Sequence, residues 1–83
     1  MRKDIKDAID RYANERCPVG DFLFAVLSNN LMASFGRADE DNRRDLFEIC
    51  DYVYNHIPAA CHGSRKTVKE WLAGRTEPYL GQK

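Results

Sequence analysis

The sequence predicts an all-α fold: a small helical domain with a central αα-hairpin, an N-terminal helix and a short C-terminal helix. Two observations lead to this fold class. Proline or glycine separates each apolar segment from the next. Within these segments apolar residues recur at helical spacing, over 2–16, 22–35, 39–57 and 64–73. Because 83 residues leave room for one core, we expect a single domain over 1–83, with an extended tail over 75–83.

The first segment, 2–16, has the pattern of a surface helix. Its polar positions carry charges of both signs, which predicts local pairs such as Lys6 with Asp10. A solvated face is the simpler interpretation, and a charged face for a partner is the alternative. Pro18 ends this helix because proline disfavours helical geometry in the residue before it. The apolar side consists of Ile5, Ala8, Ile9 and Tyr12.

The second segment starts apolar on nearly every side, from Phe22 to Leu27, after Asp21 as its N-cap. A helix that is hydrophobic all round is buried all round. A chain of 83 residues can hardly surround such a helix by itself. We therefore expect a homo-oligomer whose interface contains Phe22, Phe24 and Val26. The alternative is a central core helix in a monomer.

Within this helix, Ser28, Asn29 and Asn30 form a polar insert. The asparagine amides compete for backbone hydrogen bonds, so these residues are expected to be exposed or to line a cleft. Gly36 is the predicted C-cap of the helix.

The third helix is predicted to begin at Asp39, its N-cap, and to end before Pro58. A short link over 36–38 places it antiparallel to the second helix as the αα-hairpin. The segment 37–52 is acidic, with six acids against three bases. The predicted apolar stripe consists of Leu46, Ile49, Cys50, Val53 and Ile57, widened by Phe47 and Tyr54.

A last short helix is predicted between Ser64, its N-cap, and Gly74, its C-cap. Its apolar side consists of Val68, Trp71 and Leu72, and we expect Trp71 in the core.

The start of this last helix is the best candidate for a binding site. Glycine lets a ligand approach the backbone, a helix start presents free N–H groups, and serine, arginine and lysine add donors. The predicted phosphate-binding residues are Gly63, Ser64, Arg65 and Lys66. Helix capping alone is the alternative, and the spacing is not that of a P-loop.

A second group closes the third helix and continues into the following loop. An aromatic ring, an amide and an imidazole can stack on a base and hydrogen-bond to it. We assign recognition of a base or ribose to Tyr52, Asn55 and His62. The alternative is an ordinary helix end, with His56 placed favourably near the helix dipole.

Charge and hydropathy exclude several classes of function. Thirteen basic and thirteen acidic residues give a formal net charge of zero, which argues against a nucleic-acid binder. The apolar run 22–27 is too short to span a bilayer, and the N-terminus has no secretory pattern, so we expect no membrane partner and a cytoplasmic location. The acids alternate with bases and form no catalytic arrangement, so we expect neither an enzyme nor a cofactor.

The cysteines, Cys17, Cys50 and Cys61, are odd in number, which favours reduced thiols. A zinc site is the alternative, although no pair of potential ligands has the spacing that fixes two of them on one element. Its ligands would be Cys50, Cys61, His56 and His62. We expect no metal.

Several short motifs also follow a family pattern. They are Gly20-Asp21-Phe22-Leu23, Ala25-Val26-Leu27, Asn29-Asn30-Leu31, Tyr54-Asn55, Gly63-Ser64 and Trp71. In these motifs the chain resembles a family of short, mostly uncharacterised proteins of tailed bacteriophages and prophages, over about residues 12–72. The family has a second glycine where this chain has Asp21, and an aspartate where it has Asn30. The second difference removes a charge, so no cation is expected there.

The resemblance implies a phage accessory protein that counters host immunity. Small phage proteins of this kind sequester cyclic-nucleotide or ADP-ribose signals as oligomeric sponges, or block a defence protein as anti-CRISPRs do. We therefore expect a non-catalytic counter-defence protein of the bacterial cytoplasm that binds an anionic nucleotide-like signal between protomers. One alternative is an inhibitor that binds a host defence protein through the acidic third helix. Another is a phage structural or assembly accessory protein.

Overall fold

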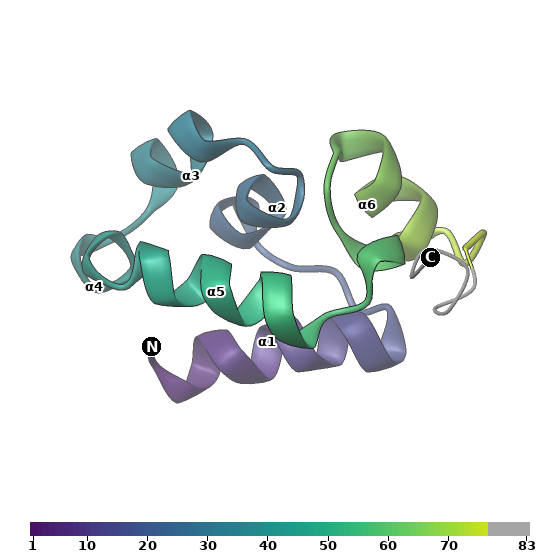
Figure 1. Ribbon diagram of the computed structural model, residues 1–83, viewed down its shortest axis with the longest axis horizontal. Helices are drawn as coiled ribbons and strands as arrows, with labels where there is room; N and C mark the ends of the chain where they lie inside the picture. Colours follow the sequence, from purple (N-terminus) through teal and green to yellow (C-terminus); the bar gives the residue numbers. More distant parts are fainter. Residues whose placement is uncertain (77–83) are drawn as a thin grey trace.

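The computed structural model describes residues 1–76, and these residues form helices and connecting turns without a strand (Figure 1). The all-α prediction is therefore confirmed for this part of the chain. The predicted tail over 75–83 lies outside the described residues from position 77 onward. The elements are α1 (Lys3–Glu15), α2 (Asp21–Leu27), α3 (Leu31–Arg37), α4 (Glu40–Arg44), α5 (Leu46–His56), the 3₁₀ turn η1 (Ala59–Cys61) and α6 (Arg65–Leu72).

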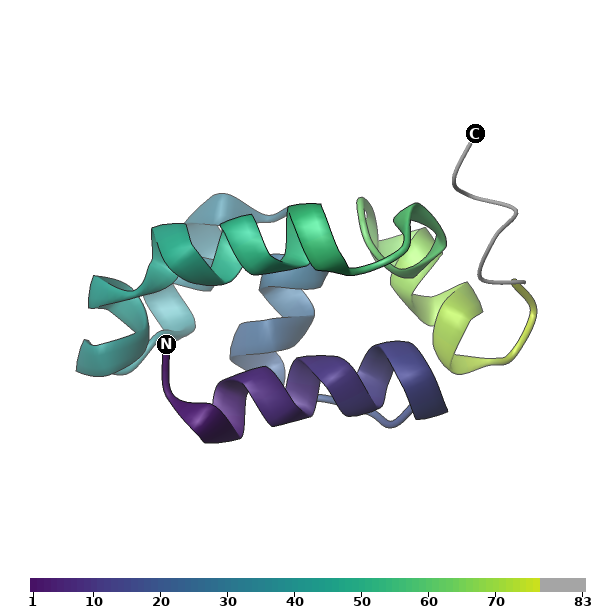
Figure 2. The same cartoon turned by 60° about the horizontal axis from the view of Figure 1, so that its bottom comes forward.

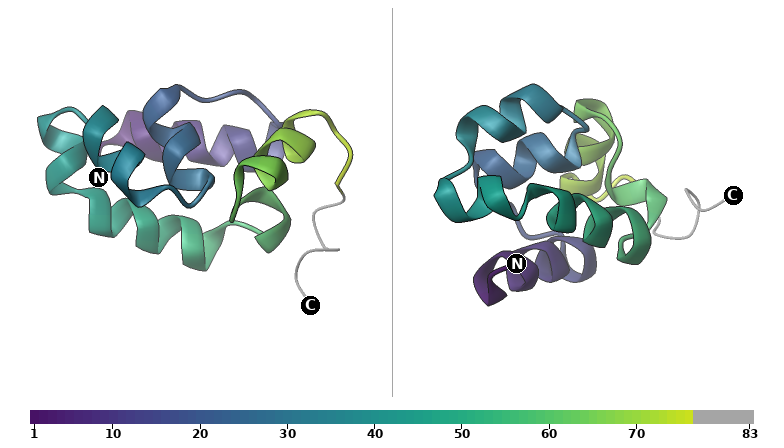
Figure 3. Two further views of the ribbon diagram at one scale, coloured as in Figure 1. Left: turned by 90° about the horizontal axis from the view of Figure 1, so that it is seen from above. Right: turned by 60° about the vertical axis from the view of Figure 1, so that its left-hand side comes forward.

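The helices are arranged along one long axis, and the molecule measures 34 × 22 × 22 Å. Helices α1 and α5 run along this axis in the same direction, with α4 at one end and α6 at the other (Figures 1 and 2). Helix α2 packs against α3 and contacts α6. Seen from the side, α3 forms the outer layer beyond α2 (Figure 3).

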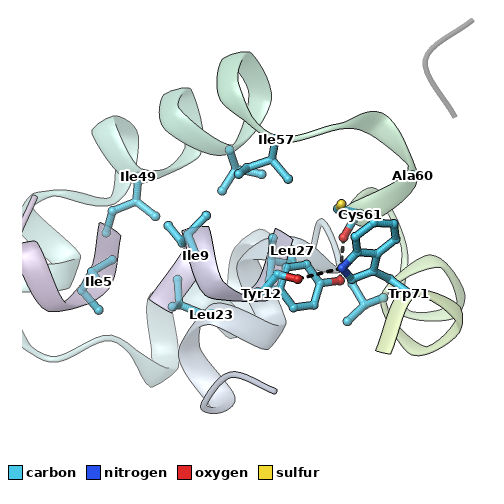
Figure 4. Close-up of a cluster of buried hydrophobic side chains, with 12 residues drawn as sticks. Ile5, Ile9, Tyr12, Leu23, Leu27, Ile49, Ile57, Ala60, Cys61 and Trp71 are labelled. Carbon is cyan, nitrogen blue, oxygen red and sulfur yellow. Dashed lines mark hydrogen bonds between the residues drawn. The ribbon is translucent and has the colours of Figure 1, made fainter. Parts of the chain in front are cut away.

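The core runs through the middle of this arrangement and draws on most of the helices (Figure 4). Helices α1, α2 and α5 supply its aliphatic part, and Trp71 closes it at the α6 end with 1% of its surface exposed. The expectation that Trp71 is a core residue is therefore confirmed. The buried cluster consists of Ile5, Ile9, Tyr12, Leu23, Leu27, Ile49, Val53, Ile57, Ala60, Cys61, Val68 and Trp71.

The prediction of one helix over 22–35 is wrong, because the chain breaks at Ser28–Asn30 into α2 and α3. Asn29 takes the left-handed conformation (φ 62°). The N–H groups of Asn29 and Asn30 donate to the carbonyls of Val26 (3.0 Å) and Ala25 (2.9 Å), which is the hydrogen-bond pattern of a Schellman motif. Two short helices therefore replace the single helix expected over 22–35.

The same three residues also start the next helix. The side-chain oxygen of Asn30 accepts a hydrogen bond from the Ala33 N–H at 3.1 Å and so caps α3. Helix α3 begins at Leu31 and continues through Gly36 to Arg37, with Ala38 as its C-cap. The prediction of Gly36 as C-cap is therefore wrong. At the start of α2 the N-cap is Gly20, and Asp21 instead occupies the first turn, where its charge favours the helix dipole.

The predicted third helix is likewise divided, into α4 and α5, by a turn at Asp45. Asp39 caps α4 as predicted, since its carboxylate accepts the Asn42 N–H at 2.8 Å. This bond, with Arg2 beside it, lowers the pKa of Asp39. The turn leaves α4 at the end of the molecule, where Arg2 donates to Asp39 (3.1 Å) and Asp41 (3.3 Å).

The predicted apolar stripe of this segment is only partly buried. Ile49 and Val53 are in the core, whereas Phe47, Cys50 and Tyr54 are exposed. The stripe is wider than the surface that the neighbouring helices cover, so its outer edge faces away from the core.

Helices α1 and α6 agree closely with the prediction. Helix α1 covers Lys3–Glu15, and the predicted pair of Lys6 and Asp10 is formed at 3.0 Å. Ser64 caps α6 by accepting the Thr67 N–H at 3.1 Å. The C-cap is Ala73 rather than Gly74, but Gly74 follows directly in the left-handed conformation (φ 73°) that glycine favours.

Candidate functional site

A groove of about 560 Å³ opens between the end of α2, the outward side of α5 and the turn before α6. Val26, Leu27 and Asn29 line it from the α2 side. His62 and Gly63 close one end, held there by the bond from the Gly63 N–H to the Leu27 carbonyl at 2.8 Å. The break after α2 therefore shapes the groove. Asn29 lines the groove from the turn that ends α2, and in a continuous helix it would not be part of a turn.

Helix α5 contributes two unusually exposed aromatic side chains to this groove. Phe47 is 89% exposed and Tyr54 is 80% exposed. With Cys50 between them they follow the i, i+3, i+7 spacing of one helix face. Single exposed apolar residues are common on protein surfaces, but an aromatic pair beside a groove is typical of an interaction surface.

The groove is weakly acidic. Asp51 is the one carboxylate among its lining residues, and no lysine or arginine lines it. Partial burial lowers the pKa of His62, so this imidazole is neutral at pH 7. Cys50 is exposed as a residue, but neighbouring atoms desolvate its thiol and raise the thiol pKa, so it is protonated and a poor nucleophile.

Helix α3 exposes a second set of apolar side chains that the sequence did not single out. Leu31 is 63%, Met32 77% and Phe35 49% exposed, while the small Ser34 faces inward. The Arg43 guanidinium lies 5.0 Å from the Phe35 ring centre. The sequence could have indicated this exposure. In a helix that begins at Leu31, Ser34 rather than the large apolar residues faces α2.

The four predicted phosphate-binding residues do not form one site. Gly63 lines the groove. The Ser64 hydroxyl is occupied by capping and lies 2.9 Å from the Thr67 hydroxyl. Arg65 and Lys66 line a separate shallow depression on α6.

The predicted base-reading residues are also separated. The Tyr52 hydroxyl donates to Asp10 of α1 at 2.5 Å, and its ring lies 4.7 Å from the His56 ring. Asn55 donates to Asp51 one turn earlier on the same helix. Of the three predicted residues, His62 alone lines the groove.

The predicted interface residues divide in a similar way. Phe22 and Phe24 are half-buried and pack against the core cluster, while Val26 also lines the groove. The chain's own helices thus cover much of α2, whereas self-association remains a prediction.

All three cysteines are free thiols. Burial raises the pKa of the Cys61 thiol to about 12. Within residues 1–76 no three His, Cys, Asp or Glu side chains are grouped closely enough to hold a metal ion.

No helix in the described part of the chain has the length and apolar character needed to cross a membrane.

Comparison of the chain with protein-family models, curated proteins and solved structures gave no match. The resemblance to phage proteins therefore remains a prediction.

Proposed function

We propose that this chain is a non-catalytic binding protein whose groove receives an apolar segment with basic flanks from a partner protein. The observation that supports this most strongly is the exposure of Phe47 and Tyr54 beside the groove. In the setting that the family resemblance implies, the partner is a host defence protein, and binding blocks it.

The aromatic side chains supply most of the binding free energy. An aromatic residue buries about 150–250 Å² when it is covered, at about 25 cal/mol per Å². Phe47 and Tyr54 together thus contribute several kcal/mol before the cost of association is subtracted. A surface ion pair contributes only about 0–1 kcal/mol. The apolar anchors therefore set affinity, and charges set orientation.

The charges around the groove favour a cationic partner. Among the described residues, Asp51 is the one carboxylate that lines the groove, and no lysine or arginine lines it. Glu48 and Asp45 do not line the groove, and both pair with the N-terminal amino group, at 2.6 Å and 3.6 Å. In this proposal Asp51 attracts and orients a segment whose apolar residues are flanked by lysine or arginine. An amphipathic helix of that composition fits the known mode in which a helix lies in an apolar groove.

The leading expectation from the sequence, capture of a nucleotide by the residues around Gly63, receives less support. Its phosphate-binding and base-reading residues belong to separate surfaces, and Tyr52 already bonds to Asp10. A nucleotide site assembled from two protomers would still be compatible with these positions.

Binding of a short amphipathic Leu/Lys peptide, measured by fluorescence anisotropy, tests the proposal. The wild-type protein should bind this peptide and not its Leu/Glu counterpart. The double variant Phe47→Ser/Tyr54→Ser should bind it at least about tenfold more weakly, because it loses both apolar anchors.

The control is Leu31→Ser/Met32→Ser, which removes two exposed apolar side chains of α3 that do not line the groove. This variant should bind like the wild type. Equal loss in both double variants would indicate unspecific adhesion and contradict the proposal. A wild-type dimer that Phe47→Ser/Tyr54→Ser converts to a monomer would show instead that a second copy covers the groove.

A further inference from the structure

Helix α6 and the turn after it gather four cationic side chains around a shallow depression of about 520 Å³. Glu70 is the single acid that lines it. The cationic side chains are Arg65, Lys66, Lys69 and Arg75. Two of these residues, Lys69 and Arg75, were not part of the predicted phosphate site.

Within residues 1–76 these cations form no salt bridge, which is also true of Arg11, Arg16, Arg37 and Arg43, but here four such side chains line one depression. At the other end of the molecule, Arg2 pairs with Asp39, and Arg44 pairs with Asp41. Along α1, lysines pair with aspartates one turn away. The depression therefore retains an uncompensated positive charge in a chain whose formal net charge is zero.

The core holds α6 in the orientation that exposes these cations. Val68 and Trp71 are buried on one side of the helix. Arg65, Lys66 and Lys69 are consequently on the exposed side. The position of the cationic surface follows from the packing of α6.

The turn that carries Arg75 is held in place by hydrogen bonds. Gly74 takes a left-handed conformation, and the Arg75 N–H donates to the Glu70 carbonyl at 3.0 Å. Arg16, the C-cap residue of α1, donates to the carbonyls of Trp71 (2.8 Å) and Thr76 (2.6 Å). Its guanidinium also stacks at 3.8 Å on the Trp71 ring. The backbone that carries Arg75 is therefore fixed beside α6 before any ligand binds.

We propose that this surface binds a compact ligand carrying several phosphate groups. Guanidinium groups bind phosphate oxygens in pairs and ammonium groups add point charges, so two of each suit a chain of phosphates better than a single small anion. The formal net charge of zero opposes binding of a long polyanion such as duplex DNA, which requires a basic excess over an extended surface. The ligand contacts side chains, since Ser64 already caps the helix N-terminus.

Isothermal titration calorimetry with tripolyphosphate, ATP, orthophosphate and a short DNA duplex tests this inference. Tripolyphosphate and ATP should bind with similar affinity if the phosphate chain is recognised, and orthophosphate should bind much more weakly. Affinity should fall as salt rises. The variant Arg65→Ala/Lys69→Ala should lose about tenfold or more in affinity, since a hydrogen bond to a charged group contributes about 1.5–3 kcal/mol.

The matched control is Lys3→Ala/Arg11→Ala, which removes the same two residue types from exposed positions on α1. It should bind tripolyphosphate like the wild type. Equal weakening in both double variants would show that overall charge is responsible and would overturn the proposal, as would binding of the duplex without binding of tripolyphosphate. Peptide binding in the groove is measured separately, so failure of either proposal leaves the other intact.

Discussion

Three side chains join the first helix to the last through hydrogen bonds that cross most of the sequence. The Tyr12 hydroxyl donates to the Cys61 carbonyl at 2.7 Å, and the Trp71 indole N–H donates to the Tyr12 carbonyl at 2.8 Å (Figure 4). Arg16 then covers the outer face of the indole. Burial raises the pKa of the Tyr12 hydroxyl, so it remains a donor at neutral pH.

Tyr12→Phe tests the contribution of this network at the scale of one atom. The substitution keeps the ring but leaves the buried Cys61 carbonyl without the hydroxyl that bonds to it. We expect the free energy of unfolding to fall by about 1–3 kcal/mol, measured by urea denaturation. Tyr54→Phe is the control, because an 80% exposed residue loses a hydroxyl that water already solvates. It should change stability by less than about 0.5 kcal/mol, and an equal loss in both would contradict the role of the buried bond.

The sequence predicted which of these residues are buried but not what they bond to. Helical spacing placed Tyr12 and Trp71 on apolar faces, which is a local property. Their hydrogen bonds join residues 49 and 59 positions apart and depend on how α1, η1 and α6 pack. Periodicity carries no information about such partners.

At the scale of elements, the main difference from prediction is the pair of asparagines between α2 and α3. The sequence showed that Asn29 and Asn30 interrupt an apolar run, but apolar residues on both sides favoured a continuous helix. Asn29 tolerates a left-handed conformation and Asn30 is a good N-cap, so together they end one helix and begin another. The groove and the exposed side of α3 both depend on this break, and neither was predicted.

Substitution of Asn29 tests the break directly. At φ 62°, alanine is strained by roughly 1–2 kcal/mol, whereas glycine is not. We therefore expect Asn29→Ala to unfold at a lower temperature than the wild type, and Asn29→Gly to unfold at a higher temperature than Asn29→Ala. Thermal unfolding followed by circular dichroism measures both. If the alanine variant is as stable as the glycine variant, the helix runs on through Asn29 and the Schellman motif is absent.

At the scale of the whole molecule, equal numbers of acids and bases conceal an uneven pairing of charge. At the α4 end, acids pair with Arg2, Arg44 and the N-terminal amino group, whereas the cations around the α6 depression, at the other end, form no salt bridge within residues 1–76 (Figure 1). The formal net charge of zero shows that the chain has no overall basic excess. It does not show where in the fold the charges lie or which of them are paired. The two proposed surfaces therefore differ in chemistry: one is apolar with a single carboxylate, Asp51, and the other is cationic.

The network around Trp71 predicts that the described helices unfold as one unit. Trp71 is the single tryptophan, so its fluorescence reports on the contact between α1 and α6, whereas far-UV circular dichroism reports on all helices. In urea the two signals should give the same midpoint, as a two-state transition requires. Val68→Ala removes buried methyl groups from α6 and should lower both midpoints equally. If the substitution lowers the fluorescence midpoint alone, α6 unfolds separately, and the bonds that Tyr12 and Arg16 make to it do not couple the two ends of the fold.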